Sequence, residues 1–416
     1  MSASGPPYSL VVSSGGLLES ARALGPRIVS DRRTIHSHPE MAYEEEQTST
    51  LVQARLRDLG IPFRAGLAKT GVVAQIKGEG GDGPCVLLRA DMDALPIEER
   101  SGVPFASEIP GVMHACGHDA HTAMLLGAAQ LLLERRSQFA GTVKLMFQPA
   151  EEGGAGAARM IEDGVLGDPK VDAAFMLHVR PELDAGQVSY AAGPLLAGAD
   201  AFTITIEGSG GHAARPHQSI DPVVIGAQIV LALQTLVSRE VDPTIPAVVT
   251  LGSFNAGNRS NVIADQAVLK GTIRAFDDDL FAHLEQRLRE VVTGVASALR
   301  ATAGIGFEMR YPPSICDPAM AEQLGESARS LLGPDAVHIS EPQMGAEDFA
   351  FVLQKVPGAM LWLGVKNPGW AAPKPLHTAI FDIDESALPI GSSTLAGVAL
   401  DYLAKGWAPG SRIGTI

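Results

Sequence analysis

Residues 113–121 read Met113-His114-Ala115-Cys116-Gly117-His118-Asp119-Ala120-His121, and the rest of the chain is organised around this stretch. Ordinary core or surface segments do not need three histidines, a cysteine and an aspartate within nine residues. Thiolate and neutral imidazole are the ligands that a borderline-soft divalent metal prefers. An apolar helical pattern follows to about Leu133, so we expect a metal-binding loop that enters a helix, with Asp119 as its N-cap. The alternative is that local hydrogen bonds satisfy these side chains.

Composition limits the class of protein. The chain has 416 residues, enough for two or three domains, and its formal net charge of -15 argues against binding to nucleic acid or to an anionic membrane surface. Three cysteines do not form a disulfide framework at this length, which predicts a reducing compartment. No basic residue precedes Arg22, unlike in a signal peptide, and no apolar run approaches the ~20 residues of a membrane span. We therefore expect a cytoplasmic protein.

Polar residues follow three apolar segments that are typical of buried strands. The segments and the residues after them are Cys85–Arg89 with Asp91, Thr142–Gln148 with Glu151 and Glu152, and Val171–Leu177 with His178. In open α/β sheets, ligands bind outside the carboxyl ends of the strands, so we expect these side chains to meet the cysteine-histidine cluster there. Asp91 would orient a ligating imidazole. One of the paired glutamates would bind metal and the other would act as a general base.

The pattern changes beyond Gly186. Strands and helices between about residues 200 and 310 follow the order βαββαβ, the ferredoxin-like arrangement. We predict an α/β protein with a first domain in two segments, residues 1–195 and 309–416, and an inserted domain, residues 196–308. The inserted domain carries a glycine-rich loop ending in His212, and Asn261 and Arg274 are candidates to bind a substrate carboxylate. His377 follows a long loop late in the chain, a usual place for functional residues.

Two features near the N-terminus are interpreted as structural. His36 has no partner nearby in the sequence. The acidic triplet Glu44–Glu46 opens a helix predicted from about Tyr43 to Leu59, where negative charge suits the helix dipole. We expect the triplet to cap and solvate that helix.

Eight segments, taken together, resemble those of one family in order and spacing. They begin at Ile35, Arg89, His114, Gln148, Gly211, Asn261, Met344 and Leu376, and read IHSHPE, RADMDALPI, HACGHDAH, QPAEEGG, GHAARPH, NVIAD, MGAEDF and LHT. They resemble the metal-dependent amidohydrolases that include hippurate hydrolase, plant indole-acetyl-amino-acid hydrolases, bacterial aminoacylases and thermostable carboxypeptidases. The resemblance runs from about residue 30 to 403.

This resemblance implies a zinc-peptidase-like catalytic domain with a mixed sheet, and an inserted lid or dimerisation domain. It implies two divalent ions per chain, zinc, manganese, cobalt or nickel. The implied ligands are Cys116, His118, Glu152, His178 and His377. It assigns Glu151 as general base and acid, Asp91 to the catalytic site, His212 to oxyanion stabilisation, and Asn261 and Arg274 to the substrate carboxylate. A departure is Arg89, where distant relatives have a histidine ligand that the cysteine cluster would replace here.

The implied reaction is hydrolysis of N-acyl L-amino acids, such as N-acetyl or N-benzoyl compounds, by a homodimer or homotetramer. One alternative is a metallocarboxypeptidase or dipeptidase that acts on short peptides. Another is a hydrolase that uses Cys116 as nucleophile, which leaves Glu152, His178 and His377 unexplained. A non-catalytic metal- or ligand-binding protein would need no base, and a structural zinc site would have no open position.

Overall fold

The computed structural model describes residues 16–308 and 310–405. The prediction that no signal peptide is present rests on the first residues of the chain, which lie outside this described part. The chain separates into two compact units. The first unit comprises Met1–Gly193, Ile315–Glu341 and Phe351–Ile416, and the second comprises Pro194–Ser314 and Pro342–Ala350. The roles predicted for them, catalytic domain and lid or dimerisation domain, stay predictions.

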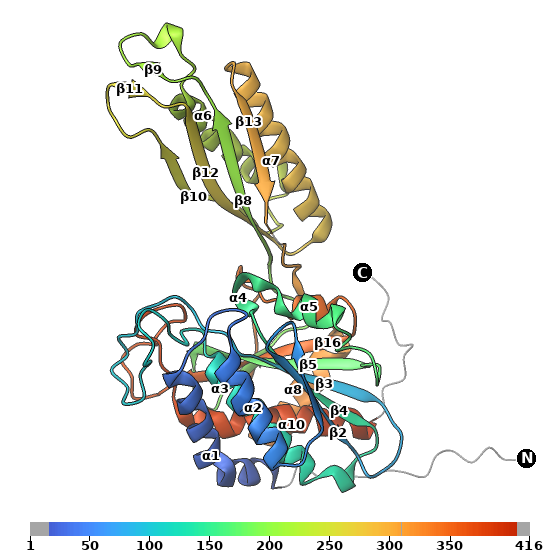
Figure 1. Cartoon of the computed structure of the whole chain (residues 1–416). Coiled ribbons are helices and arrows are strands. Elements are labelled where there is room, and N and C mark those ends of the chain that lie inside the picture. Colours follow the sequence, from blue (N-terminus) through green and yellow to red (C-terminus); the bar gives the residue numbers. More distant parts are fainter. Residues whose placement is uncertain (1–15, 309, 406–416) are drawn as a thin grey trace, which may run out of the picture. The chain divides into compact units, whose positions relative to one another are not determined.

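The first unit contains a mixed eight-stranded sheet in the order β1-β2-β4-β3-β5-β16-β6-β15 (Figure 1). Its strands are β1 (Phe63–Leu67), β2 (Gly71–Lys77), β3 (Cys85–Asp91), β4 (Thr142–Gln148), β5 (Ala173–Asp184), β6 (Val188–Tyr190), β15 (Val337–Ile339) and β16 (Gly358–Lys366). The central strands β4, β3, β5 and β16 run parallel to one another. Their burial on both faces explains their nearly continuous apolar sequences. The predicted mixed α/β architecture is confirmed.

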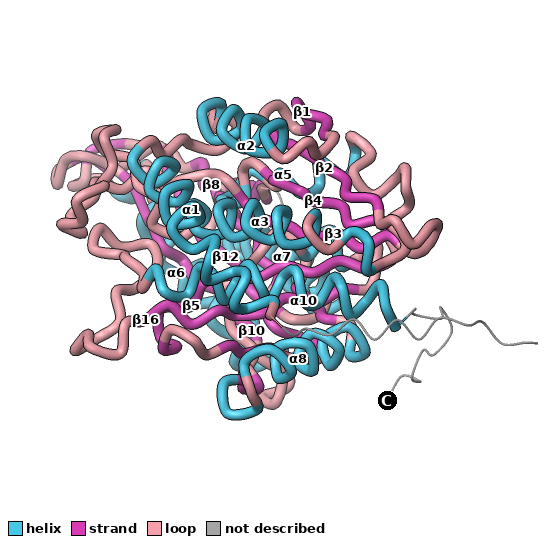
Figure 2. The backbone as a smooth tube through the Cα atoms, turned by 90° about the horizontal axis from the view of Figure 1, so that it is seen from below, coloured by secondary structure: helices cyan, strands magenta, loops and turns pink. Residues whose placement is uncertain are grey.

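Helices cover this sheet. The long ones are α1 (Leu17–Ser37), α2 (Glu46–Asp58), α3 (His118–Leu133), α8 (Pro318–Leu332) and α10 (Leu388–Lys405), and the short ones are α4 (Glu151–Gly154), α5 (Gly156–Glu162) and α9 (Ala350–Leu353). Figure 2 shows α1, α3, α10 and α8 side by side over the strands. Every residue of α3 except Gln130 and Leu133 is buried, because the helix lies between the sheet and two neighbouring helices. The N-cap of α3 is Gly117, so the prediction of Asp119 as N-cap was wrong.

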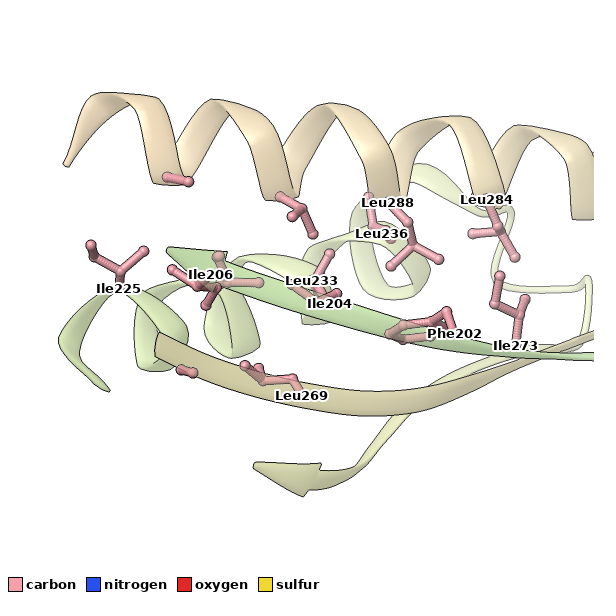
Figure 3. Packing of buried hydrophobic residues seen from close by; sticks show 14 of the residues in the cluster. Phe202, Ile204, Ile206, Ile225, Leu233, Leu236, Leu269, Ile273, Leu284 and Leu288 are labelled. Carbon is pink, nitrogen blue, oxygen red and sulfur yellow. The ribbon is translucent and has the colours of Figure 1, made fainter. Parts of the chain in front are cut away.

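The second unit has the predicted order βαββαβ. Its main elements are β8 (Gly198–Glu207), α6 (Pro222–Thr235), β10 (Ala247–Ala256), β12 (Gln266–Ala275), α7 (Asp278–Ala298) and β13 (Thr302–Phe307). The strands are antiparallel in the order β10-β12-β8-β13. Figure 3 shows Leu284 and Leu288 of α7 directed at Phe202 and Ile204 of β8, and these side chains belong to one buried apolar cluster. This packing follows from the alternation of buried and partly exposed residues along β8.

Shorter elements complete the described chain. Two small sheets pair β7 (Gly193–Leu196) with β14 (Ser314–Cys316) and β9 (Gly211–His212) with β11 (Val262–Ile263). Single turns of 3-10 helix span Arg136–Gln138, Pro216–Gln218, Pro334–Ala336 and Glu385–Ala387, and a π-helix spans Leu236–Glu240. Two described segments are long and apolar enough to cross a membrane by length and composition alone, Pro222–Glu240 and Glu385–Ala404. The second is 83% buried, as the core helix of a globular unit is.

Candidate metal centre

The carboxyl ends of the central strands bring the predicted ligands of the first unit together. Asp91 at the end of β3 pairs with Gln148 at the end of β4, and Arg89 pairs with Met176 of β5. β3 and β4 therefore end at one edge of the sheet, whereas β5 continues to Asp184, so His178 lies inside its strand and not at the strand end as predicted. His178 lies in β5, and Glu152 follows β4 in α4. The other ligands come from the loop before α3, from the first residue of α3 and from the loop after β16.

The ligand atoms of these side chains lie close to one another. Cys116 Sγ is 3.5 Å from His178 Nε2 and 3.3 Å from His377 Nε2, and His377 Nε2 is 3.1 Å from Glu152 Oε1. Three overlapping groups have all their ligand atoms within 4.8 Å: Cys116-His118-His178, Cys116-Glu152-His377 and His118-Glu151-Glu152. The structure thus gathers all five predicted ligands around the predicted base. Their roles stay predictions.

Hydrogen bonds from Nδ1 to the backbone orient two of the imidazoles, those of His118 and His178. Nδ1 of His118 donates to the backbone carbonyl of Asp93 at 2.9 Å, and Nδ1 of His178 donates to that of Val179 at 2.8 Å. Donation from Nδ1 leaves the lone pair of Nε2 free, which is the arrangement of a metal-ligating histidine. Nε2 therefore faces the cluster in both residues.

The donor set fits a divalent metal. Among the described residues, His118 Nε2 is a buried side-chain atom that makes no hydrogen bond, and Glu152 Oε1 is buried with the His377 imidazole 3.1 Å away. Buried polar atoms in folded proteins nearly always have a partner, and leaving one without a partner is costly. A cation bound among a thiolate, imidazoles and a carboxylate would satisfy both atoms, and this mixture suits a borderline-soft ion.

The surroundings shift the pKa values of these groups. Burial raises the pKa of the Cys116 thiol well above its usual range, although His118 acts in the opposite direction. Burial, followed by the neighbouring His121, lowers the pKa of His178 and keeps its imidazole neutral. Burial would also lower the pKa of His118, but Asp91 and Cys116 outweigh it and raise that pKa. A nucleophilic cysteine needs a lowered pKa, so these surroundings disfavour the Cys116 nucleophile.

Asp91 binds the imidazole of His121, which is not among the predicted metal ligands. Its carboxylate accepts from His121 Nδ1 at 2.6 Å and from Arg89 Nη1 at 2.7 Å, and lies 3.6 Å from His118 Nε2. His121 Nε2 in turn accepts from the backbone N–H of Val179 at 3.0 Å. Both nitrogens of His121 are therefore used within the protein. The catalytic role of Asp91 stays a prediction.

Sequence reasoning missed Asp93, which shapes the turn that carries the paired glutamates. Its Oδ1 accepts from the backbone N–H of Glu151 at 3.0 Å, and its Oδ2 accepts from that of Glu152 at 2.9 Å. The sequence did carry a signal for Asp93. It lies two residues after Asp91, and in an extended segment this spacing puts both side chains on the same side.

The second unit places its predicted residues in two locations. His212 in β9 pairs with Val262 in β11, and the backbone N–H of Ala213 donates to the carbonyl of Asn261 at 3.1 Å. His212 and Asn261 therefore lie on adjacent loops. Arg274 lies near the other end of β12, eight residues beyond Gln266, which is roughly 26 Å along a strand. A single chain does not bring Arg274 and Asn261 to one carboxylate within this unit, and their substrate role stays a prediction.

The mixed sheet, the nitrogen, sulfur and oxygen donors gathered beside it and the neighbouring glutamate are the features of a metal-dependent hydrolase. The chain belongs to the peptidase family M20/M25/M40, whose family model matches residues 87–401. It is 43% identical over 382 residues to IAA-amino acid hydrolase ILR1-like 4 of Arabidopsis thaliana, covering 91% of this chain and 86% of that protein. It is 41% identical over 370 residues to N-acetyl-L-cysteine deacetylase of Bacillus subtilis, covering 88% and 85%.

A solved structure shares this fold. A dinuclear metal-binding peptidase of the M20 family from Bacillus subtilis superposes with a TM-score of 0.78 at 36% identity, covering 92% of this chain and 99% of that one. The predicted family is confirmed. The protein is a hydrolase that acts on amide bonds of small molecules and uses divalent metal.

Proposed function

We propose that this enzyme hydrolyses the amide bond of N-acyl L-amino acids, such as N-acetyl, N-benzoyl or larger acyl conjugates. The products are a carboxylic acid and a free amino acid. The observation that carries the proposal is that Glu151, 7% exposed, lies beside five convergent side chains of the types that bind metal. Support for the substrate class comes from the two relatives, whose names describe an indole-acetyl-amino-acid hydrolase and an N-acetylcysteine deacetylase.

The five ligands would hold two divalent ions. Cys116 belongs to the group with His118 and His178 and to the group with Glu152 and His377, so one sulfur could serve two ions. The likeness to a dinuclear metal-binding peptidase supports this count. The donors suit zinc, manganese, cobalt or nickel. When bound, such ions polarise the scissile carbonyl and make the attacking water more acidic.

Glu151 would perform the proton transfers. Its carboxylate takes a proton from the water that attacks the amide carbon, and then gives that proton to the leaving amine. A positioned general base contributes roughly 10²–10⁴-fold in rate. Asp93 fixes the backbone of Glu151, so the carboxylate is held before substrate arrives. Asp91 would support the site through His121 and the nearby His118.

His212 would act across a dimer, and because one chain holds Asn261 and Arg274 far apart within the second unit, these two residues would come from different copies of the chain. His212 would stabilise the oxyanion and the other two would bind the substrate carboxylate. An assembly through the second unit is supported by exposed apolar side chains on α6, where Val224 is 55% and Leu231 is 64% exposed. We propose a homodimer or homotetramer on this basis. A cytoplasmic location is also proposed, and three free cysteines agree with it.

The test combines metal content with hydrolysis. Bound metal is counted by mass spectrometry, and N-acetyl, N-benzoyl and indole-acetyl amino acids are assayed with free dipeptides before and after chelation. We expect about two ions per chain, activity that chelation removes and added metal restores, and preference for the acylated substrates. Glu151→Gln should keep its metal and lose roughly 10²–10⁴-fold in kcat. Its matched control is the exposed Glu46→Gln.

Two alternatives give different results in this assay. A carboxypeptidase or dipeptidase would prefer dipeptides to the simple N-acyl amino acids, and a relative 40% identical over 382 residues is named thermostable carboxypeptidase 2. A metal- or ligand-binding protein without catalysis would keep its ions and hydrolyse no substrate. Full activity of metal-free protein would refute the metal-dependent mechanism.

A further inference from the structure

The acidic triplet near the N-terminus contains a buried carboxylate that reaches the candidate site. Glu45 is fully buried, whereas Glu44 and Glu46 are exposed. Although Glu45 is the N-cap residue of α2, its side chain makes no capping hydrogen bond, so the predicted capping role is wrong for this residue. Its Oε1 accepts instead from the backbone N–H of Ala150 at 2.9 Å, 105 residues away in the sequence.

Glu45 is held in place by two further donors. The same Oε1 accepts from the backbone N–H of Tyr43 at 2.9 Å, and Oε2 accepts from the Thr70 hydroxyl at 2.5 Å. The Glu45 carboxylate is therefore the acceptor in each of these hydrogen bonds. The hydrogen bonds from Tyr43 and Thr70 hold the Glu45 side chain in position. The carboxylate can then accept from the backbone N–H of Ala150.

The neighbouring Tyr43 binds the other end of the same turn. Its hydroxyl donates to the backbone carbonyl of Gly154 at 2.6 Å. The backbone N–H of Ala94, next to Asp93, donates to the carbonyl of Glu40 at 2.8 Å. The segment Glu40–Glu45 thus contacts both the turn from Ala150 to Gly154 and the loop that carries Asp93.

The turn needs such support because its backbone is strained. Ala150 has φ 55° and ψ 48°, a left-handed conformation that a residue with a Cβ rarely adopts. Strained conformations persist where surrounding contacts over-determine them. Here the N–H groups of residues 150, 151 and 152 are all bound by two buried carboxylates, Glu45 for the first and Asp93 for the other two.

We propose that Glu45, assisted by Tyr43, is a positioning residue that sets the direction of the Glu151 and Glu152 side chains. The proposal rests on the proposed function, in which Glu151 is the base and Glu152 a metal ligand. Glu45 acts only through the backbone of Ala150. A displacement of about 1 Å at a reacting group can cost ~10²-fold in rate, and loss of a residue that supports metal ligands typically costs about 10–100-fold in metal affinity or activity.

The experiment compares Glu45→Ala with Glu45→Gln in the full chain loaded with zinc. The alanine removes the acceptor of the Ala150 N–H, whereas the glutamine keeps an oxygen in the same place. We expect Glu45→Ala to lose about 10–100-fold in kcat with little change in KM, and about tenfold in zinc affinity measured by chelator competition. Glu45→Gln should recover both within about fivefold. Tyr43→Phe removes one hydrogen bond and should lower kcat about fivefold.

Matched controls separate positioning from general stability. Glu44→Gln and Glu46→Gln change the exposed neighbours and should leave kcat unchanged. Asp31→Asn removes another buried carboxylate, whose partner is the Arg55 side chain of α2, and should lower the melting temperature without changing kcat. If Glu45 had only a structural role, Glu45→Ala would behave like Asp31→Asn, with a lower melting temperature and an unchanged kcat.

Unchanged kcat and zinc affinity in folded Glu45→Ala would overturn the proposal, as would equal damage in Glu45→Gln. If Glu45→Ala does not fold, Tyr43→Phe provides the test. A Tyr43→Phe variant with the kcat and zinc affinity of the wild type would overturn the proposal. Glu151→Gln is measured in parallel. If it remains active, the proposed base is wrong, while the zinc affinities still test the positioning of Glu152.

Discussion

His36 gives a stability prediction whose magnitude follows from its contacts. Its Nδ1 lies 2.8 Å from Asp119 Oδ2, and its Nε2 lies 3.2 Å from Glu99 Oε1. Burial and the nearby Arg32 lower its pKa, but the two carboxylates outweigh them and raise it to about 9. An unfolded histidine has a pKa of about 6.5. A difference of about 2.5 pKa units corresponds to roughly 3 kcal/mol of folding free energy.

The sign of this effect is fixed by the direction of the shift. Because the folded pKa exceeds the unfolded one, the folded state binds the proton more tightly. The full stabilisation is therefore present below about pH 6.5, and it is lost as the pH rises through 9. The His36→Gln variant has no such group, so its unfolding free energy should not show this pH-dependent loss. The unfolding free energy of the wild type should therefore exceed that of the variant by roughly 3 kcal/mol less at pH 9 than at pH 6.5.

Urea unfolding at several pH values, followed by tryptophan fluorescence, measures this difference. Trp362 and Trp370, the tryptophans of the described residues, belong to the first unit, so their emission reports the unit that contains His36. His38→Gln is the control, because the His38 side chain is 40% exposed and should contribute little. A wild-type minus variant difference that stays constant from pH 6.5 to 9, or that shrinks on acidification, would refute the reasoning.

Three substitutions test other parts of the site. Arg89→Ala removes the buried guanidinium that binds Asp91 and Gln148, and should lower the unfolding free energy by roughly 3–5 kcal/mol in the same urea assay; a loss below about 1 kcal/mol would contradict this. Gly117→Ala places a Cβ 2.5 Å from Val179 Cγ2 at φ +88°, so it should lower both the melting temperature and the bound metal. Gly81→Ala, at φ +98° with nothing within 4 Å, should cost only the roughly 1–2 kcal/mol of the left-handed backbone; equal effects of the two glycine substitutions would exclude the steric explanation. Cys116→Ser exchanges a soft ligand for a hard one and should weaken zinc binding about tenfold or more by chelator competition, whereas Cys316→Ser, buried elsewhere, should bind zinc normally.

The parts of the fold that could be predicted are those whose sequence pattern is set by burial. β3 and β4 have continuous apolar runs because both faces are covered, and β8 alternates because only one face is. The positions of Asp91, Glu151 and Glu152 follow from the same feature, since the parallel strands β3 and β4 end at one edge of the sheet, whereas His178 lies inside β5. The short strands β6 and β15, of three residues each, carry no comparable pattern and were not predicted.

The supporting residues could not be predicted for a different reason. Glu45 lies in one acidic run with the exposed Glu44 and Glu46, and its burial and its contacts with Thr70 and Ala150 distinguish it only in the folded chain. Asp93 and His121 likewise acquire their roles from partners 58 residues away. Local sequence reports helix ends and strand periods, whereas these hydrogen bonds depend on the tertiary fold. Asp119 cannot be the N-cap because the helix begins before it, at His118, and its carboxylate instead binds Arg32 and His36 of α1.

The distribution of buried charge explains why a metal suits this site. Asp91 has Arg89 as a cationic partner, and Asp93 and Glu45 are bound by backbone N–H groups. These three carboxylates are therefore compensated within the protein. Glu152 has only the half-exposed His377 imidazole beside it, His118 Nε2 makes no hydrogen bond within the described part of the chain, and ionisation of Cys116 would add further negative charge to the same volume. Buried negative charge is costly unless a cation offsets it. Asp91, Asp93 and Glu45 therefore stabilise the surrounding backbone and side chains. The donor atoms of Cys116, His118 and Glu152 remain available to bind divalent ions.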